Sequence, residues 1–172
     1  MKQFILVLNG PMCAGKSTVT NLILEQDGIF RASYDLIKRS ISNYSADNKA
    51  HREMAKKISF STMQAALQSG LAIIIDGGFE DYREKYKELA NDFGCKYVSV
   101  NIEAPVDILE KRFIERVESA KNTGRILSVV TLEGFYSRYD WYINKNKDLD
   151  AVTFNSSVLS PEEIAKEIMK LV

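Results

Sequence analysis

The sequence has few of the residues on which disulfide-built and metal-built proteins depend. Its 172 residues include two cysteines, Cys13 and Cys95, and a single histidine. These residues form no metal-binding or redox motif, so the sequence gives no sign of a disulfide scaffold or a zinc site. A chain of this length can bury a substantial core without such cross-links.

Excess charge and long apolar runs are also missing. Twenty-three basic residues balance twenty-three acidic ones, and the formal net charge is zero. That balance gives little support for an extended nucleic-acid surface. The apolar run in MKQFILVLNG is too short for a signal peptide, and no other run is long enough to span a membrane. We therefore expect a cytoplasmic protein without a membrane partner.

Short apolar segments alternate with amphipathic ones along the whole chain. Strands are predicted at 3–9, 71–77 and 96–103, weaker strands at 28–33 and 151–155, and helices at 16–26, 48–69, 81–93, 105–121, 129–146 and 161–171. Gly70 and Gly94 each follow a helical run directly, where a left-handed cap residue is expected. Ser160 and Glu163 have the spacing of a capping box. The alternation predicts one α/β domain over 1–172, with a parallel sheet covered on both faces.

One loop carries a specific motif, because GPMCAGKST has the spacing G-x-x-x-x-G-K-[ST] between a predicted strand and a predicted helix. Such a loop surrounds phosphates with backbone N–H groups and with the positive end of a helix dipole. Lys16 would reach the β- and γ-phosphates, and the Ser17 hydroxyl would ligate Mg²⁺. The motif predicts binding of a nucleoside triphosphate by residues 10–18, which are Gly10, Pro11, Met12, Cys13, Ala14, Gly15, Lys16, Ser17 and Thr18.

Two other classes of phosphate-loop protein fit the sequence poorly. A GTPase switch needs a D-x-x-G element, but the third residue after Asp76 is Phe79, and the segment NKNKDLD misses the base-reading N-K-x-D pattern. A motor ATPase usually needs a longer chain. The short length therefore favours a small phosphotransferase, with a non-catalytic nucleotide-binding regulator as the alternative from another class.

Two aspartates are candidates for the remaining chemistry. Asp35 follows the second predicted strand, so it would lie near the loop and accept or orient the proton of an attacking hydroxyl. It would alternatively cap a helix. Asp76 ends the apolar strand LAIIID and would bind Mg²⁺ or contact the acceptor. Its alternative role is a turn residue before two glycines.

Basic residues after the fourth predicted strand form a candidate lid, placed at about 112–130. Arg112 and Arg116 are four residues apart and share one helix face, and Lys121 and Arg125 follow them. Such a cluster can close over phosphates and exclude water, although a charged surface helix would have a similar pattern. We select Arg116 and Arg125 as the catalytic arginines.

With these residues, the chain resembles the small P-loop kinases of the adenylate-kinase-like group, nearest the branch of polynucleotide kinases, zeta-toxin-like kinases and antibiotic phosphotransferases. The resemblance rests on GPMCAGKST, SYD, IIIDGGF and KRFIERVESAKNTGR. It implies a three-layer fold with five parallel strands in the order 2-3-1-4-5, and ATP with Mg²⁺ as cofactors. It also implies that Lys16 and Ser17 bind phosphate and metal, that Asp35 activates the acceptor, and that a lid arginine stabilises the transfer.

The acceptor remains open between two classes. The leading hypothesis is a kinase that acts on the hydroxyl of a small molecule. The alternative is a kinase for a nucleic-acid or nucleotide 5′-hydroxyl. Polynucleotide kinases carry an acceptor-binding arginine three residues after the activating aspartate, where this chain has Lys38. A short basic groove for such an acceptor would use Lys38, Arg39, Lys49, Arg52, Lys56 and Lys57.

Overall fold

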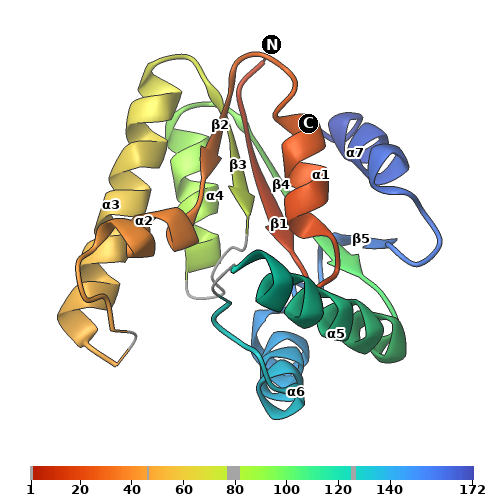
Figure 1. Ribbon diagram of the computed structural model, residues 1–172. Coiled ribbons are helices and arrows are strands. Elements are labelled where there is room, and N and C mark those ends of the chain that lie inside the picture. The colour runs from red at the N-terminus through yellow and green to blue at the C-terminus, as the bar shows by residue number, and fades with distance from the viewer. Residues whose placement is uncertain (1, 46, 77–81, 125–126) are drawn as a thin grey trace.

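The computed structural model describes residues 2–45, 47–76, 82–124 and 127–172. Its five strands are β1 (Phe4–Asn9), β2 (Ile29–Ala32), β3 (Ala72–Asp76), β4 (Lys96–Glu103) and β5 (Val152–Asn155). They form one parallel sheet in the order β2-β3-β1-β4-β5 (Figure 1). The predicted strand positions and the order implied by the resemblance are both confirmed.

Helices cover both faces of this sheet. They are α1 (Lys16–Ile23), α2 (Tyr34–Ser40), α3 (Lys49–Gln68), α4 (Arg83–Asp92), α5 (Val106–Thr123), α6 (Leu132–Trp141), the π-helical turn η2 (Tyr142–Asn146) and α7 (Pro161–Met169). Figure 1 shows α1 and α7 on one side and α3 and α4 on the other, with α5 and α6 below the ends of the strands. The three-layer architecture is therefore the predicted one.

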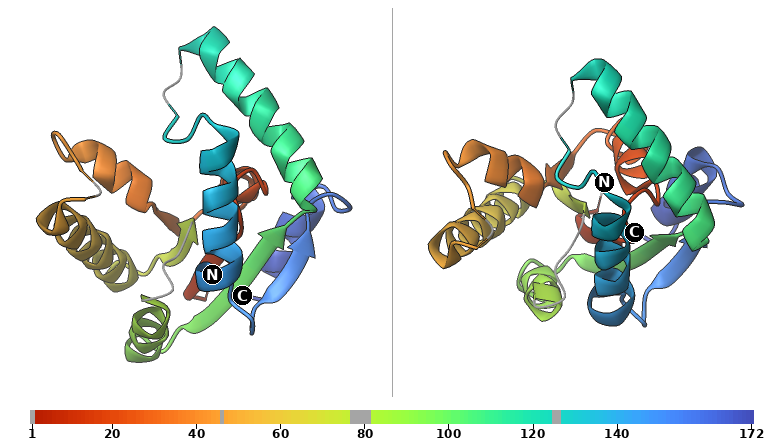
Figure 2. Two further views of the ribbon diagram at one scale, coloured as in Figure 1. Left: turned by 90° about the horizontal axis from the view of Figure 1, so that it is seen from below. Right: turned by 60° about the horizontal axis from the view of Figure 1, so that its bottom comes forward.

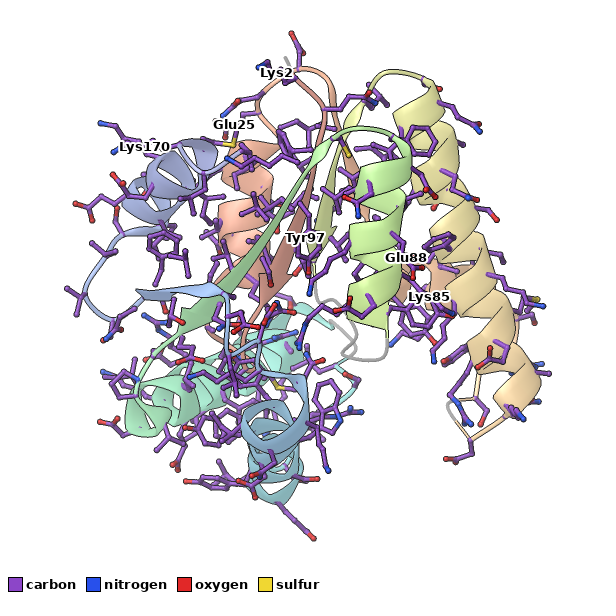
Figure 3. All side chains as sticks on the ribbon, turned by 180° about the vertical axis from the view of Figure 1, so that it is seen from behind. Lys2, Glu25, Lys85, Glu88, Tyr97 and Lys170 are labelled. Atoms are coloured by element: carbon purple, nitrogen blue, oxygen red, sulfur yellow. The ribbon has the colours of Figure 1, made fainter. Side chains whose placement is uncertain are left out.

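The central strand explains why two cores form. All six residues of β1 are buried, and their side chains alternate between the two faces. Leu6 and Leu8 belong to one core with residues of α1, α5 and α7, whereas Ile5 and Val7 belong to the other with residues of α3 and α4. Figure 3 shows the second face from behind, with Tyr97 of β4 on the side that α4 covers.

Several helix ends match the sequence pattern. Gly70 and Gly94 have φ angles of +82° and +61°, in the left-handed region predicted for cap residues. The Ser160 hydroxyl accepts a hydrogen bond from the backbone N–H of Glu163, and the Glu163 carboxylate accepts one from the N–H of Ser160. This capping box is confirmed.

Two elements differ from the prediction. Helix α2 was not expected, because the weak strand before it and its seven-residue length gave no clear helical pattern. The helix expected over 129–146 begins only at Leu132, where the Thr131 hydroxyl caps it, and its last five residues form the π-helical turn η2. No helix in the described ranges combines the length and apolar character needed to cross a membrane.

Candidate active site

The phosphate loop lies between β1 and α1, at the edge of the sheet where the strands end (Figure 1). Gly10 has a φ angle of +149°, and a Cβ atom there would lie 2.1 Å from the carbonyl oxygen of Ile102 in β4. Gly15 has a φ angle of +95° and begins α1. Glycine at position 10 is therefore required both by the backbone angle and by the close approach of the neighbouring strand.

Lys16 is bound to the loop from which it extends. Its ammonium nitrogen lies 2.8 Å from the carbonyl oxygen of Gly10 and 2.8 Å from that of Pro11. Burial lowers the pKa of Lys16 below its ordinary value, because desolvation disfavours the charged amine. The loop carbonyls thus hold this cation in the structure.

Charged side chains from three other elements influence the pKa of Lys16. The negative charges of Asp76 at the end of β3 and Asp35 in α2 raise the pKa of the lysine, whereas the positive charge of Arg116 in α5 lowers it further. These effects are smaller than that of burial, but they show that the groups lie within electrostatic range of one ammonium. Three residues predicted from separate sequence segments thus all influence the pKa of Lys16.

Ser17 and Asp76 form a pair of hard oxygen donors. The Ser17 hydroxyl donates to Oδ2 of Asp76 across 3.2 Å. The described residues contain no group of three or more potential protein ligands for a metal. Two protein oxygens are enough for Mg²⁺, because this ion usually keeps several waters and takes nucleotide phosphates as its other ligands. Asp76 is not simply a turn residue, since its carboxylate also pairs with Arg31 of β2 at 2.5 Å.

Asp35 lies in the first turn of α2, and its side chain is 73% exposed. It forms an ion pair with Lys38, one turn later in the same helix. The alternative role of Asp35 as a helix cap is wrong, because Ser33 occupies the N-cap position. The Asp35 carboxylate is therefore exposed to solvent in the helix that follows β2.

The candidate lid contains two arginines with different surroundings. Arg112 donates through Nη1 to the Ser156 hydroxyl at 3.0 Å and to the Cys13 carbonyl at 3.5 Å, and through Nη2 to the Ser156 carbonyl at 2.7 Å. It thereby ties α5 to the phosphate loop and to the segment after β5. Arg116 follows one turn later with an exposed side chain, and Arg125 lies outside the described residues. Figure 2 shows α5 and α6 running across the ends of the strands.

Sequence reasoning missed Arg31 and Ser156. Arg31 is a single charged residue in one of the two weaker predicted strands, and only the pairing of β2 with β3 brings it to Asp76. Ser156 follows the last strand and has no motif around it. An arginine inside an otherwise apolar strand was the one signal that could have drawn attention to Arg31.

Comparison with known proteins shows to which family this chain belongs. The family model AAA_33, described as an AAA domain, matches residues 5–130. The chain belongs to this family. Among curated proteins, the L-seryl-tRNA(Sec) kinase of Methanococcus maripaludis is 23% identical over 184 residues, which cover 97% of this chain. The AAA-domain chain spans 65% of the length of that kinase.

Solved structures share the fold of this AAA-domain chain at low sequence identity. A Chloroflexus aurantiacus protein to which kinase activity is attributed has a TM-score of 0.73 and 14% identity, with complete coverage of both chains. The APS kinase of Mycobacterium tuberculosis, solved with AMPPNP and APS, has a TM-score of 0.68 and 16% identity over 99% of this chain and 97% of its own. The predicted resemblance to small P-loop kinases is confirmed, and phosphotransfer is the chemistry that these relatives support.

Proposed function

We propose that this protein is an ATP-dependent kinase that transfers the γ-phosphate to a hydroxyl of a small-molecule acceptor in the cytoplasm. The observation that carries the proposal is the phosphate loop, where the loop carbonyls hold Lys16 and Ser17 contacts Asp76, together with the exposed Asp35 in the helix that follows β2. A protein that only holds or senses a nucleotide has no need of an exposed carboxylate beside the bound phosphates. The non-catalytic regulator is therefore the weaker alternative.

Each residue has a separate role in this proposal. Residues 10–18 bind the phosphates of ATP, and Lys16 compensates the charge of the transferred group. Ser17 and Asp76 would hold Mg²⁺, which would supply further positive charge to offset the phosphates. Arg116 and Arg125 stabilise the charge of the migrating phosphoryl group from the lid.

Asp35 acts on the acceptor. Its carboxylate accepts the proton of the acceptor hydroxyl while the hydroxyl oxygen forms a bond to the γ-phosphorus. The bond from that phosphorus to the β-γ bridging oxygen breaks, and ADP leaves with the electron pair. The exposed position of Asp35 in α2 suits this role, since an acceptor has to reach it from solvent.

A nucleic-acid or nucleotide 5′-hydroxyl acceptor is the second candidate. Residues 34–57 contain six lysines and arginines against three acidic residues, whereas the whole chain is neutral. Lys38 and Arg39 lie three and four residues after Asp35 in α2, so they share its helix face. The curated relative acts on a seryl-tRNA, which combines a small hydroxyl with a nucleic acid.

An acceptor screen separates these functions. Purified protein is incubated with Mg²⁺ and γ-labelled ATP, together with small alcohols, nucleosides, 5′-hydroxyl oligonucleotides or seryl-tRNA. We expect the wild-type protein to label the hydroxyl of a small molecule, and we expect the Asp35→Asn variant not to label it. Labelling of oligonucleotides that weakens steeply with salt would favour the second candidate. ATP binding without transfer to any acceptor would favour the regulator.

A further inference from the structure

Arg31 lies at the junction of three elements beside the phosphate loop. From β2, its Nη2 donates to Oδ2 of Asp76 in β3 at 2.5 Å, and its Nη1 donates to Oδ1 of Asn21 in α1 at 3.3 Å. The same oxygen of Asp76 accepts the hydrogen bond of Ser17. The guanidinium therefore touches the carboxylate that the proposed function assigns to Mg²⁺.

The surroundings of Asp76 require a positive partner. Its side chain is only 9% exposed, and a carboxylate with so little contact with water is costly unless a cation compensates it. Arg31 supplies that cation in the structure, and the ion pair is as short as a strong charge-assisted hydrogen bond. A carboxylate neutralised in this way has little attraction left for a free divalent ion.

Arg31 itself is incompletely satisfied. Its Nε atom is buried and has no hydrogen-bond acceptor among the residues that the structure describes. One of its two acceptors is the neutral amide of Asn21, at a distance typical of a weak bond. The guanidinium is therefore held mainly by Asp76, and little else opposes its movement when Asp76 takes another partner.

We propose that Arg31 is the counter-ion that Asp76 exchanges for nucleotide-bound Mg²⁺, so that the site accepts the metal with the nucleotide and rejects the free ion. The proposal rests on the assignment of Ser17 and Asp76 to Mg²⁺. The phosphates of ATP bring the negative charge that offsets both Arg31 and the metal, whereas a free divalent ion meets the guanidinium without that compensation. Arg31 is then a positioning residue that acts through Asp76.

Binding of Mn²⁺, used in place of Mg²⁺ and followed by electron paramagnetic resonance of the free ion, tests this proposal without any turnover. Without ATP, we expect Arg31→Gln to bind Mn²⁺ at least tenfold more tightly than the wild type. Arg31→Lys keeps the charge and is expected to remain within threefold of the wild type. The factor by which ATP increases Mn²⁺ affinity should fall at least tenfold in Arg31→Gln.

Two further variants make the test specific. Adding Asp76→Asn to Arg31→Gln is expected to abolish the increase in Mn²⁺ affinity. Arg83→Gln removes a similar guanidinium from Asp148, at 3.3 Å elsewhere in the fold, and is expected to leave Mn²⁺ binding unchanged. Circular dichroism and thermal melting establish that each variant folds, and Arg31→Met serves as a second neutral replacement in case the glutamine variant does not.

Three outcomes would overturn the proposal: a folded neutral variant without increased Mn²⁺ affinity, an equal increase in Arg31→Lys, or a gain that survives Asp76→Asn. The metal assignment is tested separately, because the single variant Asp76→Asn should weaken Mn²⁺ binding in the presence of ATP. If it does not, Asp76 is no metal ligand. If it does while Arg31→Gln shows no gain, the metal site stands and the role of Arg31 is wrong.

Discussion

The ammonium nitrogen of Lys16 lies 2.8 Å from the carbonyl oxygen of Pro11, so the loop provides this cation with acceptors of its own. Replacing Lys16 by Met should weaken ATP binding at least a hundredfold, because the phosphates lose their principal side-chain cation. Isothermal titration with ATP measures this loss. Lys2→Met is the matched control and should bind ATP normally, because Lys2, labelled at the top of Figure 3, precedes the start of β1, whereas the loop follows its end.

The same variant should not lower the melting temperature. Burial lowers the pKa of Lys16, which means that the folded protein disfavours its charged form. At a pH below the lowered pKa of the folded state, the charged lysine opposes folding. This penalty decreases as the pH rises from that pKa to the pKa of Lys16 in the unfolded chain. Lys16→Met removes the penalty at neutral pH. A clear drop in melting temperature would show that the two carbonyl hydrogen bonds outweigh the cost of burial.

Asp35→Asn should separate binding from transfer. The amide keeps the size of the side chain but cannot accept the acceptor proton, so we expect the transfer rate to fall about 10²- to 10⁴-fold. ATP affinity should stay within threefold of the wild type. Asp47→Asn, which changes another exposed aspartate in the loop before α3, is the control. Transfer at the wild-type rate by Asp35→Asn would leave that residue no role beyond its ion pair with Lys38.

Substitutions of Arg112 and Arg116, the two lid arginines that the structure describes, should affect different properties. Arg112→Gln removes contacts to Cys13 and Ser156 and should lower the free energy of unfolding by about 1–2 kcal/mol. Arg116→Gln should leave that free energy unchanged but lower kcat about a hundredfold, because its exposed side chain is free to contact phosphate. Urea unfolding and steady-state kinetics measure the two effects. A normal kcat in Arg116→Gln would transfer the catalytic role to Arg125.

Tyr142 should make stability depend on alkaline pH. It is 1% exposed, and its hydroxyl donates to Glu103 at 2.6 Å. Burial, followed by that carboxylate, raises the pKa of Tyr142 above its ordinary value near 10. Above pH 10 the unfolded chain therefore loses a proton that the folded protein keeps, and the stability from this residue falls by about 1.4 kcal/mol per pH unit.

The comparison with Tyr142→Phe isolates this effect. The difference in free energy of unfolding between wild type and variant should shrink as the pH rises above 10. Tyr136→Phe serves as the comparison for burial, because Tyr136 is exposed and the hydrogen bond from its hydroxyl to Glu110 is the main cause that raises its pKa. A constant difference between wild type and Tyr142→Phe across this range would contradict the pKa shift.

Much of the fold could be predicted because its signals are local. Strands β1, β3 and β4 are apolar runs, the caps at Gly70, Gly94 and Ser160 lie within a few residues of the helices they end or begin, and the phosphate loop is one continuous motif. Helix α2 escaped prediction because seven residues are too few to show a period. Its first turn nevertheless carries Asp35 and its last turn Lys38 and Arg39, which is the charge order that a helix dipole favours.

The parts of the site that escaped prediction depend on contacts distant in sequence. Asp76 was predicted as a metal ligand, but its partner Arg31 is 45 residues away and meets it only across the β2-β3 pair. Arg112 and Ser156 are 44 residues apart, on a helix and a loop that no local pattern relates. Strand pairing and helix packing create such contacts, so their residues carry no spacing that a single sequence reveals.

The central place of β1 has a consequence for how the protein is made. This strand is synthesised before both of its neighbours, since β3 and β4 begin only at Ala72 and Lys96. Until both have emerged, five apolar residues of this strand and its unpaired backbone amides remain accessible to other chains. Before β3 emerges both edges of β1 are open, and synthesis that stops between β3 and β4 would still leave one edge open, so the nascent chain is exposed to aggregation until β4 is complete.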